Sequence, residues 1–100
     1  MTADFAFDHT RDDDVHVVTL HGELDLSNAH QVRDALVGIA GSAVVVDLAD
    51  LTFLDSSGIA ALLAARKRIL DAGHRFSLRG AQGMVRRVLE VTGLEHLLTD

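Results

Sequence analysis

The sequence has no cysteine, proline, tryptophan or tyrosine, and its only aromatic residues are 4 Phe. Without cysteine, the chain can form neither a disulfide framework nor a thiolate metal site, which fits an intracellular location. The longest uninterrupted apolar stretch, Ile59 to Ala65, is far shorter than the roughly 20 residues that span a bilayer. Residues 1–20 are acidic and interrupted by charge, unlike a signal peptide. We therefore expect a cytoplasmic protein without membrane insertion.

Basic charge is also scarce, and it is unevenly placed. The net charge is −6, and Arg11 is the only Lys or Arg among the first 25 residues. General nucleic-acid binding needs a basic face and aromatic stacking platforms, so we expect no direct contact with nucleic acid. The 100 residues are 48% hydrophobic, which predicts one compact domain over residues 1–100.

The first half of the chain alternates strand patterns with a helix pattern. Two β-prone runs around the acidic turn Asp12–Asp14 predict a hairpin. A helix follows, with Ser27 or Asn28 as its N-cap and Gly41 as its end. The nearly continuous β-branched run Ala43–Leu48 predicts a central strand covered on both faces, and residues 49–55 read as a connection.

The second half continues the alternation. A helix is expected to begin at Ser56 or Ser57 and to end at Gly73, followed by a strand over 74–78. A second amphipathic pattern over 82–92 predicts another helix, which Gly93 ends. Alternating strands and helices predict an α/β fold with right-handed crossovers, in which helices pack on a mixed or largely parallel sheet.

The most informative segment is Asp55-Ser56-Ser57-Gly58, because it joins an apolar strand to a helix. The first backbone N–H groups of a helix lack internal partners and carry partial positive charge, so a phosphate on either serine is favoured there. Such a phosphate adds about −1.5 to −2 charges beside Asp55 and opposes a docked partner. Asp25 follows an earlier strand, and we expect Asp25, Asp55 and Ser56 to be neighbours at the carboxyl ends of the strands. By spacing alone, a purely structural role is the better explanation: a helix cap or loop carboxylate for Asp25 and Asp55, and an N-cap for either serine.

Three segments carry a resemblance that covers essentially the whole chain: Gly22–Asp25, Val44–Gly58 and Val91–Leu94. They look like the STAS domain of bacterial anti-sigma factor antagonists. Membership implies a STAS-like α/β fold and phosphorylation of the first serine of the Asp-Ser-Ser-Gly element, which is Ser56 here. Ser57 is then a structural serine. The choice of Ser56 over Ser57 rests on the resemblance more than on local chemistry.

The resemblance also implies a partner-switching function. The unphosphorylated protein binds an anti-sigma factor that is itself a serine kinase and thereby releases a sigma factor. Phosphorylation of Ser56 breaks the complex, and a metal-dependent serine phosphatase restores it. The docking surface is expected to include Asp25, Asp55, Ser56, Ser57 and Gly58. Gly58 has two open explanations, a close approach of backbone or partner and a packing role for the absent side chain.

Other functions fit the residues less well. No G-x-S-x-G elbow accompanies the serines and no histidine is placed beside them by spacing, so we expect no catalytic residue and no enzyme activity. The segment 80–83 lacks the Lys-Ser/Thr ending of a P-loop, and the histidines show no zinc-ligand spacing. We accordingly expect no cofactor and no metal. The remaining alternative is a STAS subunit of another assembly, such as a stress-signalling complex or a lipid-transport ATPase.

Overall fold

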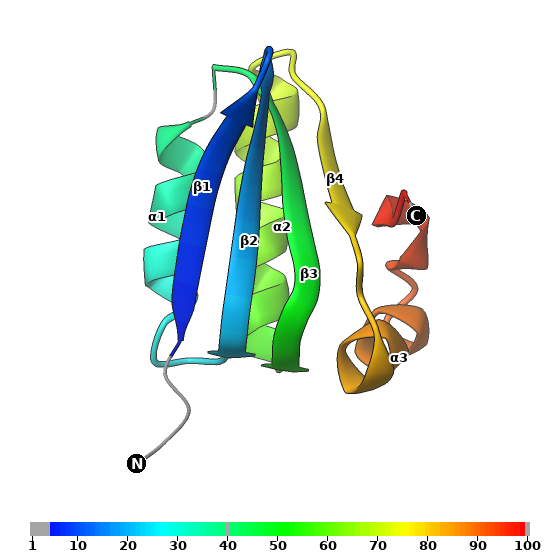
Figure 1. Ribbon diagram of the computed structural model, residues 1–100. Helices are drawn as coiled ribbons and strands as arrows, with labels where there is room; N and C mark the ends of the chain where they lie inside the picture. The colour runs from blue at the N-terminus through cyan, green and yellow to red at the C-terminus, as the bar shows by residue number, and fades with distance from the viewer. Residues whose placement is uncertain (1–4, 40, 100) are drawn as a thin grey trace.

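The computed structural model describes residues 5–39 and 41–99, and Figure 1 shows their arrangement. The elements follow one another in this order: β1 (Ala6–Asp12), β2 (Val15–Leu24), α1 (Ala29–Gly38), β3 (Ala43–Leu54), α2 (Ser56–Asp71), β4 (Phe76–Arg79), α3 (Gly83–Val91) and the short 3₁₀ helix η1 (Glu95–Leu97). One sheet carries the strands in the order β1-β2-β3-β4. β1 is antiparallel to β2, whereas β2, β3 and β4 are parallel, so the expected mixed α/β sheet is confirmed.

The N-terminal hairpin forms as its alternating pattern predicts. β1 and β2 pair from Ala6↔His21 to Asp12↔Val15, and the turn between them holds Asp13 at φ 56°. A short polar side chain is among the few that adopt this left-handed conformation readily. The acidic turn that separates the two β-prone runs therefore closes the hairpin.

β3 is longer than expected, because residues 49–54 continue the strand instead of forming a connection. Leu51 and Leu54 are buried and pair beside Gly22 and Leu24, which keeps the segment in the sheet. The pairing shifts register twice, between Thr19 and His21 and between Gly22 and Glu23. Full burial on both faces was also a wrong prediction: Val44, Val46 and Leu48 are buried, whereas Val45 is only half-buried.

The helix ends agree with the sequence at two of three places. Gly73 and Gly93 follow the caps of α2 and α3 with positive φ, and each donates a backbone hydrogen bond to the carbonyl three residues earlier. The prediction for α1 was wrong, since this helix ends at Gly38 with Ile39 as its cap, before Gly41. The Ile39 amide donates to the Leu36 carbonyl, so the last turn tightens there and Gly41 plays no part in ending the helix.

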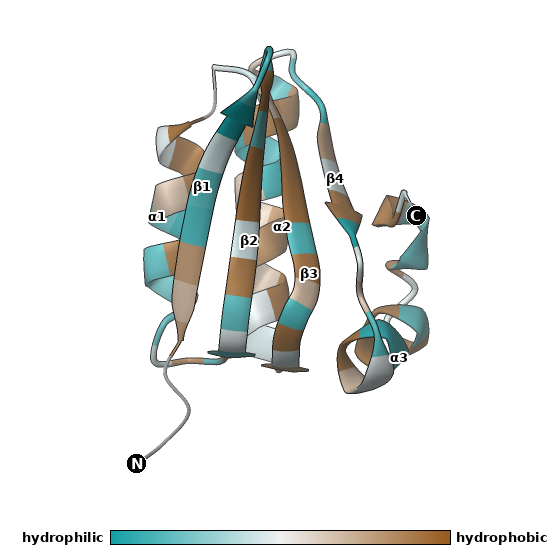
Figure 2. Ribbon diagram, in the orientation of Figure 1, coloured by the Kyte–Doolittle hydropathy of each residue, from teal (hydrophilic) through white to brown (hydrophobic). Residues whose placement is uncertain are grey.

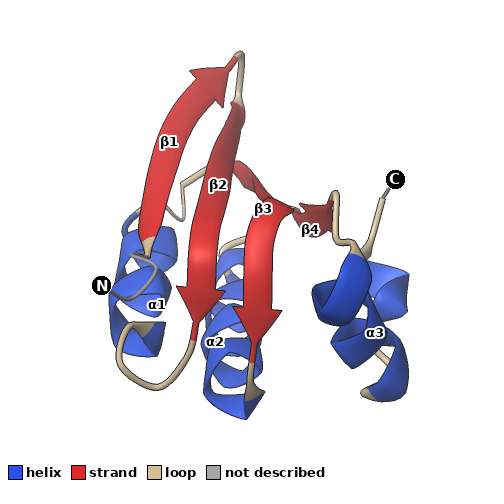
Figure 3. Cartoon of the chain, turned by 60° about the horizontal axis from the view of Figure 1, so that its bottom comes forward, coloured by secondary structure: helices blue, strands red, loops and turns tan. Residues whose placement is uncertain are grey.

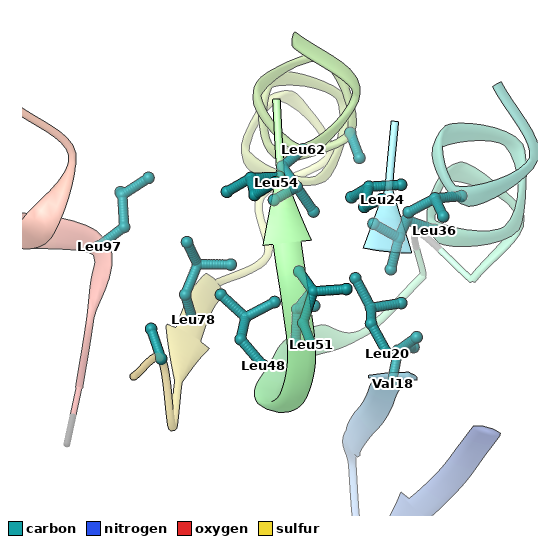
Figure 4. Packing of buried hydrophobic residues seen from close by; sticks show 14 of the residues in the cluster. Val18, Leu20, Leu24, Leu36, Leu48, Leu51, Leu54, Leu62, Leu78 and Leu97 are labelled. Carbon is teal, nitrogen blue, oxygen red and sulfur yellow. The ribbon is translucent and has the colours of Figure 1, made fainter. Parts of the chain in front are cut away.

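The helices are unevenly distributed around the sheet. α1 and α2 lie side by side behind β1, β2 and β3, and α3 lies apart from them near β4 (Figures 1 and 3). The buried side chains of β2 and β3 meet those of the helices in one core, part of which Figure 4 shows. Coloured by hydropathy, β3 is mostly apolar and β1 mostly polar, as expected for a central and an edge strand (Figure 2).

Candidate functional site

The start of α2 is built by Asp55. Its backbone is extended, and its Oδ1 atom accepts a hydrogen bond from the Gly58 amide at 3.0 Å, so Asp55 is the N-cap. Ser56 and Ser57 are the first two helical residues. Within the described part of the chain, the amides of these two serines donate no hydrogen bond. The first turn therefore presents free N–H groups at the positive end of the helix.

The two serines differ in their surroundings. The Ser56 side chain is exposed, whereas Ser57 is half-buried and lines a hollow between α1 and α2. Neither hydroxyl has a hydrogen-bond partner among the residues that the structure describes, so capping is done by Asp55 alone. Ser56 is consequently the more accessible of the two hydroxyls to another protein.

Asp25 organises the neighbouring β2–α1 connection. Its Oδ1 atom accepts hydrogen bonds from the Ser27 amide at 2.9 Å and the Ser27 hydroxyl at 2.6 Å. The Asn28 side chain holds the same loop, because its Oδ1 accepts from the Asp25 amide and its Nδ2 donates to the Glu23 carbonyl. Of the two N-cap candidates, Asn28 has the cap position, but its side chain makes no cap hydrogen bond.

These two helix starts meet at one edge of the sheet. Leu24 pairs with Leu54, and the Asp55 amide donates to the Leu24 carbonyl at 3.3 Å. Asp25 and Asp55 thus directly follow paired residues of neighbouring parallel strands, which places Asp25, Asp55 and Ser56 together as expected. Two carboxylates, the starts of two helices and the exposed Ser56 therefore lie at the same edge of the sheet.

Gly58 lies beneath this edge and is buried. A Cβ atom on it would come within 2.7 Å of Leu54 Cδ1 and 2.8 Å of Leu24 Cγ. Of the two explanations left open by the sequence, the structure supplies the packing role. The place of Gly58 in the partner-binding set stays a prediction, as do those of Asp25, Asp55, Ser56 and Ser57.

Sequence reasoning missed Leu26 in this region, and it proposed Asn28 only as a helix cap and not as the residue that holds the loop. Leu26 is 71% exposed although it is a large apolar residue, and Asn28 is 9% exposed although it is polar. Leu26 stands between Asp25 and Ser27 in an otherwise polar loop, and an apolar residue there is the sign that could have drawn attention. Asn28 gave no comparable sign, because its role depends on the path of the loop back to Glu23.

Other polar groups form separate contacts. His9 and His16 contact each other on the hairpin, and His21 bonds with Asp8 at 2.8 Å and Asp50 at 3.3 Å. No hydrogen bond joins a histidine to Ser56 or Ser57 in residues 5–39 and 41–99. In those same ranges, no group of three or more His, Asp or Glu side chains is arranged to hold a metal ion. None of the described helices is both long enough and apolar enough to cross a membrane.

Comparison with known sequences finds a family that matches nearly the whole chain. Residues 7–99 match the family described as "Mlab, STAS domain". A STAS-domain containing protein of Pseudomonas aeruginosa is 32% identical over 82 residues, which are 80% of this chain and 81% of the relative. The anti-sigma F factor antagonist of Paenibacillus polymyxa is 32% identical over 84 residues, which are 80% of this chain and 72% of the relative.

Two solved structures superpose on this fold over a larger share of the chain than the sequence relatives cover. The anti-sigma factor antagonist SpoIIAA in its unphosphorylated form superposes with a TM-score of 0.83 at 26% identity, covering 95% of this chain and 87% of that one. The Bacillus cell fate determinant SpoIIAA in the phosphorylated form gives a TM-score of 0.76 at 25% identity, covering 95% and 90%.

Proposed function

Since this chain belongs to the STAS domain family, we propose that it acts as an anti-sigma factor antagonist that is switched by phosphorylation of Ser56. The names of its relatives support the antagonist role. The observation that carries the switch is the exposed Ser56 at the first position of α2, next to the N-cap Asp55 and at the same sheet edge as Asp25. In this proposal the unphosphorylated protein binds an anti-sigma factor and so releases the sigma factor.

The chemistry of the switch follows from this site. The anti-sigma factor is a serine kinase that transfers the terminal phosphoryl group of ATP to the Ser56 oxygen, forming a P–O bond as the bond to ADP breaks and the hydroxyl proton leaves. The free amides of the first turn accommodate the new anion within the domain. Its charge of about −1.5 to −2 adds to the charges of Asp55 and Asp25. In the complex this charge would repel negative groups of the partner or lose its hydrating water, and either effect weakens binding.

The remaining parts of the proposal concern the cellular setting. A metal-dependent serine phosphatase hydrolyses the Ser56 phosphate and restores binding, and the whole cycle takes place in the cytoplasm. The protein is a substrate of the kinase and has no enzyme activity of its own. Asp25, Asp55, Ser56, Ser57 and Gly58 form or support the docking surface, with Gly58 acting from beneath through packing.

Substitution of the two serines tests the switch. The kinase anti-sigma factor of the same organism, with Mg-ATP, is expected to add one phosphate to wild type and to Ser57→Ala but none to Ser56→Ala. Ser56→Ala is expected to keep binding, and Ser56→Asp to weaken it, because the added carboxylate supplies about one of the phosphate charges. Intact-mass and peptide mass spectrometry locate the phosphate, and a pull-down before and after reaction reports binding.

Two results would contradict the proposal in different ways. Phosphate on Ser57 would move the switch to the second serine and leave the antagonist role in place. Binding that never changes, with no phosphate on either serine, would favour the alternative of a constitutive STAS subunit in a stress-signalling complex or a lipid-transport ATPase.

A further inference from the structure

A groove runs between α1 and α2 and starts beside Leu26 and Ser57, next to the proposed phosphorylation site Ser56. Its near part has a volume of about 330 Å³ and is lined on the α1 side by Leu26, Ala29 and His30, and on the α2 side by Ser57, Ala60 and Ala64. A second hollow of about 400 Å³ shares Arg33 and Ala64 with the first and continues to Lys67 and Arg68. We call this continuous depression the α1–α2 groove.

The near part of the groove is apolar and shallow-walled. Ala60, Ala61 and Ala64 recur at helical spacing on α2, and their small side chains permit the backbone of another element to approach closely. Leu26, at the end of the groove nearest Ser57, is 71% exposed and offers a large apolar side chain to a partner. An apolar strip between two side-by-side helices suits the apolar face of a third helix.

The far part of the groove is basic, although the chain carries a net charge of −6. Arg33, Lys67 and Arg68 line it, against the single carboxylate of Asp34. Arg33 pairs with Asp34 and Lys67 with Asp71, both in exposed pairs that hold a side chain only weakly. The Arg68 guanidinium makes no hydrogen bond or ion pair among the described residues. This end therefore attracts negative charge.

We propose that the α1–α2 groove receives an acidic amphipathic helix of the partner anti-sigma factor, with its apolar face on the alanines and its carboxylates toward Arg33 and Arg68. This inference rests on the proposed function, to which it adds a second contact and the chemistry of the partner segment. The stretch of α2 from Ser57 to Arg68 advances about 1.5 Å per residue, so it accommodates roughly three turns of a docked helix.

Phosphorylation of Ser56 would also affect binding in the groove. Ser57 lines the near end, and Ser56 adjoins it on α2. A phosphate on Ser56 adds negative charge at the mouth of a groove that selects an acidic segment. The same modification thus weakens the edge contact and the groove contact together.

Charge reversal with a matched control tests the basic end. Arg68→Glu is expected to weaken binding of the kinase anti-sigma factor about tenfold at low salt, because it replaces an attraction by a repulsion. The difference from wild type is expected to shrink at high salt, where exposed charges are screened. Arg87→Glu, on the exposed surface of α3 and outside the groove, is the control and is expected to bind like wild type. Isothermal calorimetry at two salt concentrations gives the affinities.

Cross-linking identifies the occupant of the groove directly. Because the chain has no cysteine, Ala64→Cys carries a single benzophenone label in the groove, and Ala72→Cys carries one at the exposed end of α2. The label at position 64 is expected to capture an acidic helical segment of the kinase, identified by mass spectrometry, whereas the label at position 72 is expected not to capture it. Capture of a second copy of this chain, or of a segment without carboxylates, would overturn the proposal.

The outcomes separate this proposal from the function on which it rests. If the kinase binds wild type and modifies Ser56, but Arg68→Glu binds as Arg87→Glu does and position 64 captures nothing, only the groove proposal is wrong. If the kinase neither binds wild type nor modifies any serine, both proposals are wrong.

Discussion

At the scale of single residues, Gly58 fixes where the candidate site lies. It is the third residue of α2, and its bare Cα packs against Leu24 and Leu54, the last residues of the two strands beneath it. Figure 4 shows Leu54 with Leu62 of α2, and Leu24 near Leu36 of α1. The helix start is thereby pressed onto both strand ends, and Ser56 is held over the edge that Asp25 shares.

Replacing this glycine is expected to destabilise the domain. In Gly58→Ala, the new methyl group meets Leu54 and Leu24 at 2.7 and 2.8 Å, so both side chains must shift. Such overpacking costs about 1–3 kcal/mol of unfolding free energy. Urea denaturation followed by far-UV circular dichroism measures the loss.

The same substitution at Gly38 provides the control. Gly38 ends α1 with nothing within 4 Å of an added Cβ, so Ala there is expected to gain up to about 0.5–1 kcal/mol. If Gly58→Ala and Gly38→Ala changed the unfolding free energy equally, Leu24 and Leu54 would have room for a methyl group at position 58, which contradicts this packing.

Single residues were also where the sequence was least informative about the site. Asp55 and Ser56 could be placed at a helix start because a strand pattern and a helix pattern meet there. The fixing role of Asn28 could not be predicted, because both of its hydrogen bonds depend on how the β2–α1 loop folds back. Leu26 differs from Asn28 in this respect, because a large apolar residue in a polar loop is a local sign of its exposure.

At the scale of elements, the β1–β2 hairpin contains a contact that depends on pH. His9 and His16 share a hydrogen bond across the two strands, which requires an unprotonated ring nitrogen on one of them as the acceptor. Partial desolvation lowers the pKa of His16 below its ordinary value of 6.5, and the neighbouring His9 and Arg11 lower it further. Protonation of His16 therefore opposes the folded hairpin.

The sign of the pH effect follows from this lowered pKa. Between the folded-state pKa of His16 and its unfolded value of 6.5, the unfolded chain binds more protons than the folded one. The contribution of neutral His16 to the unfolding free energy is fully present above about pH 6.5 and is lost as the pH falls through the folded-state pKa. Urea midpoints measured from pH 7.5 down to pH 5 are thus expected to fall more steeply for wild type than for His16→Gln.

His30→Gln is the control for the substitution of a histidine by glutamine, since the exposed His30 side chain makes no hydrogen bond among the described residues. Its pH dependence is expected to match wild type. Parallel curves for wild type, His30→Gln and His16→Gln would contradict a role for His16 in the acid sensitivity of the hairpin.

Elements were predicted best where a periodic pattern and a stop residue agreed. α2 and α3 end at Gly73 and Gly93 as expected, because glycine adopts the left-handed conformation that closes a helix. β3 was cut short because its alternation of buried residues breaks after Leu48, where Ala49 and Asp50 are both exposed. The break belongs to a register shift against β2, which a single strand pattern does not contain.

At the scale of the whole molecule, one core joins all parts except the outer strand. Its buried residues come from β2, β3 and β4, from all three helices and from η1, while Phe7 of β1 packs against it. η1 contributes Leu97, and the chain after it returns to β4, where the Thr99 amide donates to the Leu78 carbonyl. The elements therefore depend on one another for burial.

A shared core predicts cooperative unfolding. We expect one urea transition, with an unfolding free energy of about 5–15 kcal/mol, because no element keeps its buried face when the others leave. With no Trp or Tyr for intrinsic fluorescence, far-UV circular dichroism and methyl NMR signals are the suitable probes. Coincident transitions are expected, and an earlier loss of signals from α3 and η1 would reveal a separately unfolding C-terminal unit.

The two register shifts in β3 have a consequence for how this chain can change in length. At each shift β3 uses one residue more than β2, so Thr19 faces Asp47, His21 faces Asp50 and Leu24 faces Leu54. Inward positions change from even to odd numbers at the first shift, which brings Leu51 into the core, and return to even at Leu54. One extra or missing residue between Asp47 and Asp55 would reverse which residues of β3 face inward and would turn the start of α2 out of alignment with the core. A change of two residues would keep the same residues facing inward.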